Sequence, residues 1–199
     1  IEATPVDERN GDVHFFNGLS YIYLEQYQNA IYQWQILVND FQSSDYWSNG
    51  TDEIAYTHWL YLDDTETAAE VYLKFVDDFP YHEDSPAFLY YGARMYERSN
   101  EFELAAQTWE RMLVEYPAYP DAFRAQQLSA ISYYRAQNYD AAIESLNTLL
   151  QYANTPDDQA AAHFWLGKTY QMLGDNNQAI ESWEAAYRAA SNSYYSIRA

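Results

Sequence analysis

One alanine recurs at an almost constant interval along this chain. Ala30, Ala68, Ala105, Ala142 and Ala179 follow one another at steps of 38, 37, 37 and 37 residues. Neighbouring columns keep the same interval. A large apolar residue stands four positions after each alanine, namely Trp34, Tyr72, Trp109, Leu146 and Trp183, and an aromatic residue stands nine positions before it, namely Tyr21, Trp59, Tyr96, Tyr133 and Tyr170. A period of this length indicates a repeated supersecondary unit that buries its apolar face by stacking on its neighbours.

Each repeat is predicted to be a pair of antiparallel helices. Apolar residues recur at intervals of three and four within each half, as in an amphipathic helix. A small residue stands twelve positions before four of the five alanines, and Tyr56 takes that place in the second repeat. Small residues in facing positions let two helix backbones approach closely. The expected domains are a leader at residues 1–12 and a repeat domain at 13–199, with units at about 13–48, 49–85, 86–122, 123–159 and 160–199.

The charge of the chain limits its partners. Thirty Asp and Glu stand against ten Lys and Arg, which gives a net charge of −20. Such a chain is repelled by phosphate backbones and by anionic membrane surfaces, so we expect no nucleic-acid partner. Cysteine is absent, which excludes disulfides and thiolate ligands within the chain. No apolar run approaches the ~20 residues that span a bilayer, and we expect no transmembrane segment.

The sequence carries no pattern typical of catalysis or of metal binding. Metal-ligand spacing is missing among the four histidines, His14, His58, His82 and His163. His14 and His163 occupy one repeat column, which favours a packing role. Two Glu-Ser dipeptides, at Glu144 and Glu181, also share a column and are interpreted as structural parts of the repeat. We therefore expect no catalytic residue, no metal and no cofactor in this chain.

The fifth repeat most clearly resembles the tetratricopeptide repeat family. The matching residues are Trp165, Leu166, Gly167, Tyr170, Gly174, Asp175, Ala179, Ile180 and Trp183. The resemblance implies an all-α fold, a right-handed superhelical α-solenoid of about five helical hairpins. It also implies a concave groove, lined by the first helix of each hairpin, that binds a protein or peptide partner.

Basic residues gather at the positions that this resemblance assigns to the groove. The candidate groove residues are Tyr90, Arg94, Arg98, Arg124, Gln127, Tyr134, Arg135, Phe164 and Lys168. Two interpretations of the bases remain open. Either they bind a carboxylate-bearing ligand, such as a peptide tail or a peptidoglycan stem, or they pair with acids such as Glu97 and Glu101 and keep the inner face soluble.

The C-terminal segment resembles a more specific group of proteins. Tyr194-Tyr195-Ser196-Ile197-Arg198-Ala199 is similar to the end of the helical repeats of bacterial soluble lytic murein transglycosylases. This resemblance implies the non-catalytic part of a cell-envelope enzyme, periplasmic or otherwise extracytoplasmic, whose catalytic domain lies downstream. Such a part contacts peptidoglycan or partner proteins.

A second resemblance supports an alternative. The junction from Tyr116-Pro117 to Asp121-Ala122 is similar to junctions in envelope lipoproteins of outer-membrane assembly and of the Tol-Pal system. That alternative implies a free-standing adaptor, lipid-anchored upstream of residue 1, that binds a protein partner. Under either reading, an exposed edge of the first hairpin is expected to allow dimerisation through Phe15, Phe16, Tyr21 and Tyr23.

Overall fold

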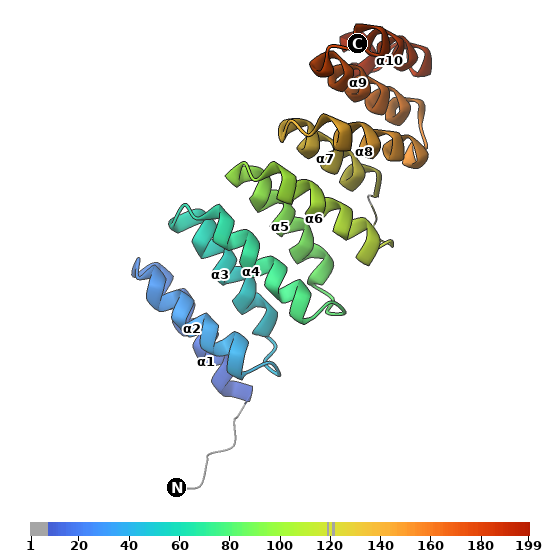
Figure 1. Ribbon diagram of the computed structural model, residues 1–199. Helices are drawn as coiled ribbons and strands as arrows, with labels where there is room; N and C mark the ends of the chain where they lie inside the picture. Colours follow the sequence, from blue (N-terminus) through green and yellow to red (C-terminus); the bar gives the residue numbers. More distant parts are fainter. Residues whose placement is uncertain (1–7, 119, 121) are drawn as a thin grey trace, which may run out of the picture. The chain divides into compact units, whose positions relative to one another are not determined.

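The computed structural model describes residues 8–118, 120 and 122–199. These residues form eleven helices and no strand, which confirms the predicted all-α class. The chain divides into two compact units, residues 1–99 and residues 100–199. Unit 1 contains α1 (Glu8–Tyr23), α2 (Tyr27–Asp40), α3 (Trp47–Tyr61), α4 (Thr65–Asp78) and α5 (Ser85–Ser99) (Figure 1). Unit 2 contains α6 (Phe102–Glu115), α7 (Ala122–Arg135), α8 (Tyr139–Tyr152), α9 (Pro156–Leu173), α10 (Asn176–Ala189) and the short α11 (Tyr194–Arg198).

Within each unit, every helix packs against the next one along the chain, from α1 to α5 and from α6 to α10. The last helix, α11, packs on both α9 and α10. The first helices of the repeats are α1, α3, α5, α7 and α9, and the second helices are α2, α4, α6, α8 and α10. The division between the units falls between α5 and α6.

The repeating alanines lie on the second helices, and all five are at most 1% exposed. In the first and fifth hairpins, the tryptophan four positions after the repeating alanine packs against the small residue of the first helix, which explains why that residue must be small. Trp34 Nε1 donates to the carbonyl oxygen of Phe15 at 3.1 Å, and Trp183 Nε1 donates to that of Phe164 at 3.3 Å. A Cβ on Gly18 or Gly167 would lie 2.2 Å from the partner indole, so only glycine fits there. The predicted facing columns are therefore the packing columns of these hairpins.

A left-handed residue stands five positions before each repeating alanine, in the turn that joins the two helices of a hairpin. These residues are Glu25 (φ 58°), Asp63 (φ 53°), Asn100 (φ 66°), Gln137 (φ 62°) and Gly174 (φ 81°). Only the fifth is the glycine that this backbone region favours. The next residue but one starts the second helix, and side chains of Asp64, Asn138 and Asp175 cap three of these helices.

The register predicted for the second repeat was wrong by one residue. Ala55, fully buried, occupies the small position on α3, whereas Tyr56 is 39% exposed. The reason lies in the turn that follows. The backbone amide of Asp64 donates to the carbonyl oxygen of His58, six residues back, whereas the equivalent amides of Gln26 and Asn138 donate to residues five back, so this turn holds one additional residue. Because of this additional residue, each position of α3 is taken by the residue that lies one place earlier in the chain than the count back from Ala68 predicts.

Two expectations for the N-terminal region also need correction. The helix α1 begins at Glu8, inside the stretch expected to be a leader, while residues 1–7 lie outside the described part of the chain. Gly11 lies inside α1, and a Cβ there would lie 2.6 Å from Ser44 Cβ, so this glycine lets α1 lie close to the segment between α2 and α3. Phe15, expected on an exposed edge, is 9% exposed and packs in a core cluster with Trp34, against which the partly buried Tyr21 also packs.

Candidate functional site

The centre of the candidate site in unit 2 is Lys168, on α9. Its ammonium lies over three aromatic rings, with Nζ 4.8 Å from the ring centroid of Trp165, 5.5 Å from that of Tyr134 and 5.8 Å from that of Phe164. Distances below about 6 Å allow cation–π attraction. Lys168 makes no ion pair with any carboxylate in the described part of the chain.

A series of polar and ring contacts extends this site across α7, α9 and α11. Arg124 Nη1 donates to Gln127 Oε1 at 2.7 Å, and Gln127 Nε2 donates to Tyr195 Oη at 3.5 Å. The ring of Tyr195 in turn lies 5.7 Å from that of Phe164. Gln127 is only 3% exposed, so it lies at the base of the site and orients its neighbours. These residues, with Tyr134, Trp165 and Lys168, are called the α7/α9 face below.

Each of the other predicted groove bases described next lies either over an aromatic ring or beside a carboxylate. The guanidinium carbon of Arg135 lies 3.9 Å from the ring centroid of Phe102 in unit 2, and that of Arg98 lies 4.8 Å from the ring centroid of Trp59 in unit 1. Arg94, also in unit 1, donates instead to the carboxylate of Glu97. Tyr90 is half-buried on the same helix, and its ring lies 5.8 Å from that of Tyr91. Pairing with an acid therefore holds for Arg94, whereas Arg98, Arg135 and Lys168 lie on aromatic faces.

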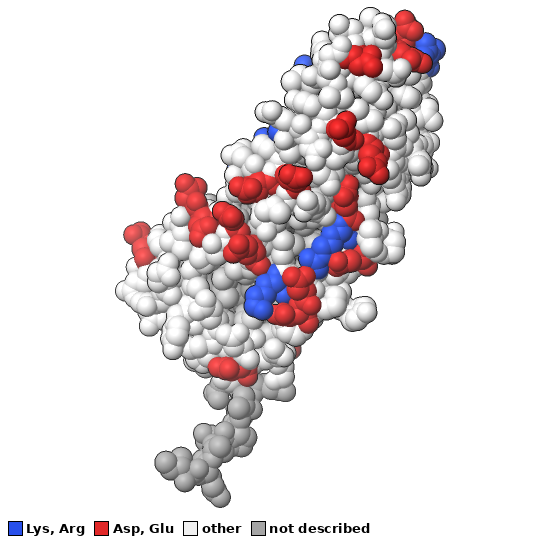
Figure 2. All heavy atoms as spheres, viewed as in Figure 1, with Lys and Arg blue, Asp and Glu red and all other residues white. Residues whose placement is uncertain are grey.

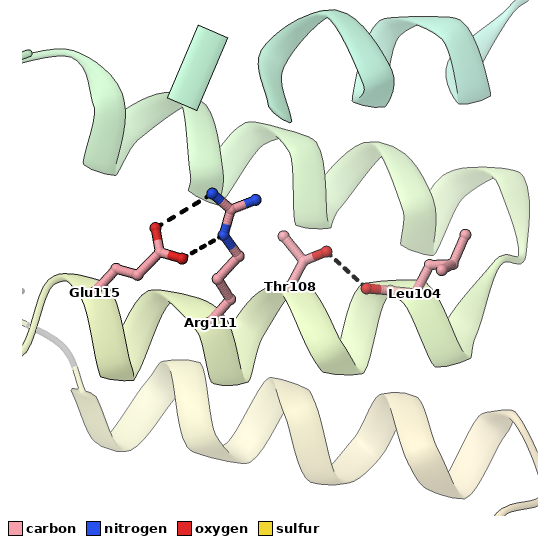
Figure 3. A network of polar contacts seen from close by, with 4 residues as sticks. All are labelled: Leu104, Thr108, Arg111 and Glu115. Carbon is pink, nitrogen blue, oxygen red and sulfur yellow. Dashed lines mark hydrogen bonds and ion pairs between the residues drawn. The ribbon is translucent and has the colours of Figure 1, made fainter. Parts of the chain in front are cut away.

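Bases on the second helices behave differently. Arg111 on α6 binds both carboxylate oxygens of Glu115, at 2.5 and 3.3 Å, and on the same helix the Thr108 hydroxyl donates to the carbonyl oxygen of Leu104 (Figure 3). Lys74 and Arg188 likewise pair with acids one turn away, Asp78 and Glu184. On the face where second helices are seen in front, Asp and Glu are scattered and Lys and Arg are few (Figure 2). Such pairs satisfy each base locally and contribute little to stability.

Sequence reasoning missed the aromatic partners of these bases. Trp59 was placed in a packing column, Trp165 was named only for the family resemblance, and Tyr195 was noted only as part of the C-terminal motif. One signal was available for Trp165, because it precedes Lys168 by three residues and so lies one helical turn away on the same side. Columns counted back from Ala68 would place Gly50 and Thr57 on the groove side of the second repeat, but both are buried in the shifted register of α3.

The residues considered for catalysis or metal binding do not converge. Among the described residues, no group of three or more His, Asp or Glu is arranged to hold a metal ion. In the first Glu-Ser dipeptide, Ser145 is buried and accepts a hydrogen bond from Gln126 Nε2 at 2.7 Å, whereas Glu144 is exposed. Burial lowers the pKa of His163 below its ordinary 6.5, and nearby Arg188 adds to this shift. That shift fits a packing histidine.

The geometry defines an α-helical hairpin-repeat protein with a polar and aromatic face on its first helices. The tetratricopeptide repeat family model matches residues 60–123 and 128–194. The chain belongs to the tetratricopeptide repeat family. No helix of the described part is long and apolar enough to cross a membrane.

Solved structures with a similar fold include a protein with TPR-like repeats and several structures of MamA. A putative kinesin light chain repeat protein of Podosopora anserina superposes with a TM-score of 0.59 at 16% identity, covering 94% of this chain and 97% of that one. MamA from Desulfovibrio magneticus RS-1 gives a TM-score of 0.56 at 14% identity, covering 93% and 97%. MamA MSR-1 gives 0.56 at 15% identity, covering 93% and 98%. No curated protein sequence matches the chain. At these identities the likeness concerns the fold alone.

Proposed function

We propose that this chain is a non-catalytic interaction module whose α7/α9 face binds a partner that presents a carboxylate beside an apolar group. The observation that carries the proposal is Lys168, a cation held by three rings and by no acid of the described chain. An ammonium on aromatic rings can still form a charge-assisted hydrogen bond with an incoming carboxylate. The rings of Tyr134 and Phe164 offer contact area for the apolar group.

The neighbouring polar groups support the same ligand chemistry. Arg124 is exposed and donates to the amide oxygen of Gln127, and its positive charge favours a carboxylate-bearing ligand at this face. Tyr195 and Gln127 form a hydrogen-bonded base beneath it. Electrostatic steering would be local, because the chain as a whole carries a charge of −20.

The test is a titration of the full chain with a labelled peptide that ends in Leu and a free carboxylate, compared with the same peptide amidated at its C-terminus. We expect binding of the acid form, weakened about three- to tenfold in Lys168→Met, which keeps the apolar stem and removes the charge. Lys74→Met is the matched control, since Lys74 is an exposed, paired base on a second helix. Equal binding of the acid and the amide would contradict the proposal.

A second candidate is supported by the C-terminal segment, which resembles soluble lytic murein transglycosylases and supplies Tyr195 to the α7/α9 face. In that case the chain is the accessory part of a peptidoglycan enzyme of the bacterial cell envelope, and its carboxylate ligand is a peptidoglycan stem peptide. The alternative is an envelope adaptor that binds a protein tail. Adding purified muropeptides as competitors of the labelled peptide separates the two, because only the first predicts displacement.

A further inference from the structure

Unit 1 carries a group of aromatic side chains that does not belong to its core. The rings of Tyr27 and Tyr61 are stacked, with centroids 4.8 Å apart and planes 11° apart. Tyr56 meets Trp59 edge to face at 5.6 Å and Tyr61 at 6.2 Å. Tyr56 and Tyr61 are 39% and 40% exposed. These four residues, on α2 and α3, are called the aromatic patch.

The core of this hairpin leaves the aromatic patch outside. The buried side of α3 is formed by residues such as Ile54, Ala55 and Thr57, and the shifted register turns Tyr56 away from them. Further apolar surface is formed by Leu60, which is 48% exposed, by Tyr23 at the end of α1, which is 89% exposed, and by Leu24 in the turn that follows, which is 58% exposed. Adjacent exposed apolar residues of this kind mark interaction sites, and Tyr and Trp are the residues most enriched there.

The charge around the aromatic patch indicates the sign of its partner. Residues 1–99 hold 18 Asp and Glu and four Lys and Arg. Glu25 and Asp63, both exposed, lie in the turns that precede Tyr27 and follow Tyr61. The rings already hold one cation, since the Arg98 guanidinium lies 4.8 Å from the Trp59 centroid. Acidic rims and electron-rich ring faces both attract cations and repel carboxylates.

We propose that the aromatic patch is a docking site for a basic peptide segment in which Arg or Lys alternates with apolar residues. The apolar side chains pack on Tyr56 and Tyr61, and the basic groups lie over ring faces and against Glu25 and Asp63. An acidic glycan or a carboxylate-bearing peptide does not fit this patch, because the net negative charge of unit 1 repels it. The site is independent of the α7/α9 face, which lies in unit 2 and prefers the opposite charge.

The experiment measures fluorescence anisotropy of a labelled peptide of alternating Arg and Leu with the full chain. A second peptide has Glu at every Arg position. The test variant is Tyr56→Ala/Tyr61→Ala. Its matched control is Tyr81→Ala, because Tyr81 is fully exposed in the same unit but lies in the turn between α4 and α5. Circular dichroism of every variant verifies that the helices are intact.

We expect the basic peptide to bind and the acidic one not to bind, with affinity about tenfold lower in the double variant and unchanged in Tyr81→Ala. Arg98→Gln should bind the basic peptide more tightly, since it frees the Trp59 face and removes a like charge, whereas Asp63→Asn should bind it more weakly. Absence of binding, equal binding of the acidic peptide, or equal loss in Tyr81→Ala would each overturn the proposal. Binding of the carboxylate peptide to Lys168 is unaffected by these variants, so the two proposals fail separately.

Discussion

At the scale of single residues, the repeating alanines set how closely helices approach. Ala142 is fully buried on α8, in a cluster with Tyr133 and Ala106. We predict that Ala142→Leu lowers the free energy of unfolding by about 1–3 kcal/mol, because the added atoms overpack this crossing. Ala87→Leu, at an exposed position near the start of α5, is the control and should change it little. Urea denaturation measures both, and equal effects would contradict the packing role.

The turn residues provide a test of backbone strain without packing changes. Gly174 has φ 81°, and a Cβ built there has no atom within 4 Å. Gly174→Ala should therefore destabilise the chain by about 1–2 kcal/mol through the backbone alone. Gln137→Gly, at the same position of the preceding hairpin, should be neutral or stabilising. Thermal unfolding compares the two, and a destabilised Gln137→Gly variant would show that its side chain matters more than its φ.

His163 gives a residue-scale prediction for pH. Its folded-state pKa is lowered, first by burial and then by Arg188, so the unfolded chain binds its proton more readily. The free energy of unfolding should fall as the pH drops below 6.5, until the folded-state pKa is passed. His163→Gln removes this contribution without adding a charge. We expect denaturation curves at a series of pH values to show a smaller loss on acidification in the variant, and a parallel loss in both proteins would contradict the assignment.

At the scale of helices, the hairpins use two alternative pairs at the same contact. In the α9/α10 hairpin, Gly167 contacts Trp183. In the α7/α8 hairpin, Ala130 and Leu146 occupy the same two columns, and both are fully buried. Gly167→Ala alone should cost about 1–3 kcal/mol because its Cβ meets the indole. The double variant Gly167→Ala/Trp183→Leu should recover part of that loss, since it has the alanine and leucine found in the α7/α8 hairpin. Unfolding of the single and double variants measures the coupling, and additive losses would argue against direct contact.

Much of the helical arrangement follows from the sequence because packing imposes a strict period. The alanine column and the apolar column four residues later are buried in four hairpins and largely buried in the fifth. The start of α3 could not be placed correctly from these columns. The interval of 38 residues between Ala30 and Ala68 reveals one additional residue but not its place in the repeat, and the structure locates it in the turn after α3, where Asp64 bonds back to His58.

The candidate site was predictable only in part. The register placed Arg124, Arg135 and Lys168 on first helices, where they lie. Whether a base pairs with an acid or with a ring depends on residues far along the chain, such as Phe102 for Arg135. Spacing within one helix does not carry that information. Arg94, whose partner Glu97 lies one turn away, and Lys168, which lies one turn from Trp165, are the exceptions that sequence could resolve.

At the scale of the whole molecule, repulsion among the many acidic side chains destabilises the fold, and added salt can weaken this repulsion. Thirty acids and ten bases leave a net charge of −20, which repels itself in the compact state. We predict that the melting temperature rises with added sodium chloride, because screening weakens this repulsion more than it weakens the few helical ion pairs. Differential scanning fluorimetry over a salt series checks this, and a falling melting temperature would mean that the ion pairs dominate.

The central claim is the proposal that, in unit 2, the carboxylate-bearing partner binds the α7/α9 face and leaves the second helices of that unit free. The most direct test is NMR chemical-shift mapping on the full chain as the Leu-carboxylate peptide is added. We predict shifts at Lys168, Tyr134 and Arg124, and none at Arg111 or Arg188, whose charges are paired on second helices. Shifts centred on α6 or α10, or no shift at Lys168 while the peptide binds, would contradict the account.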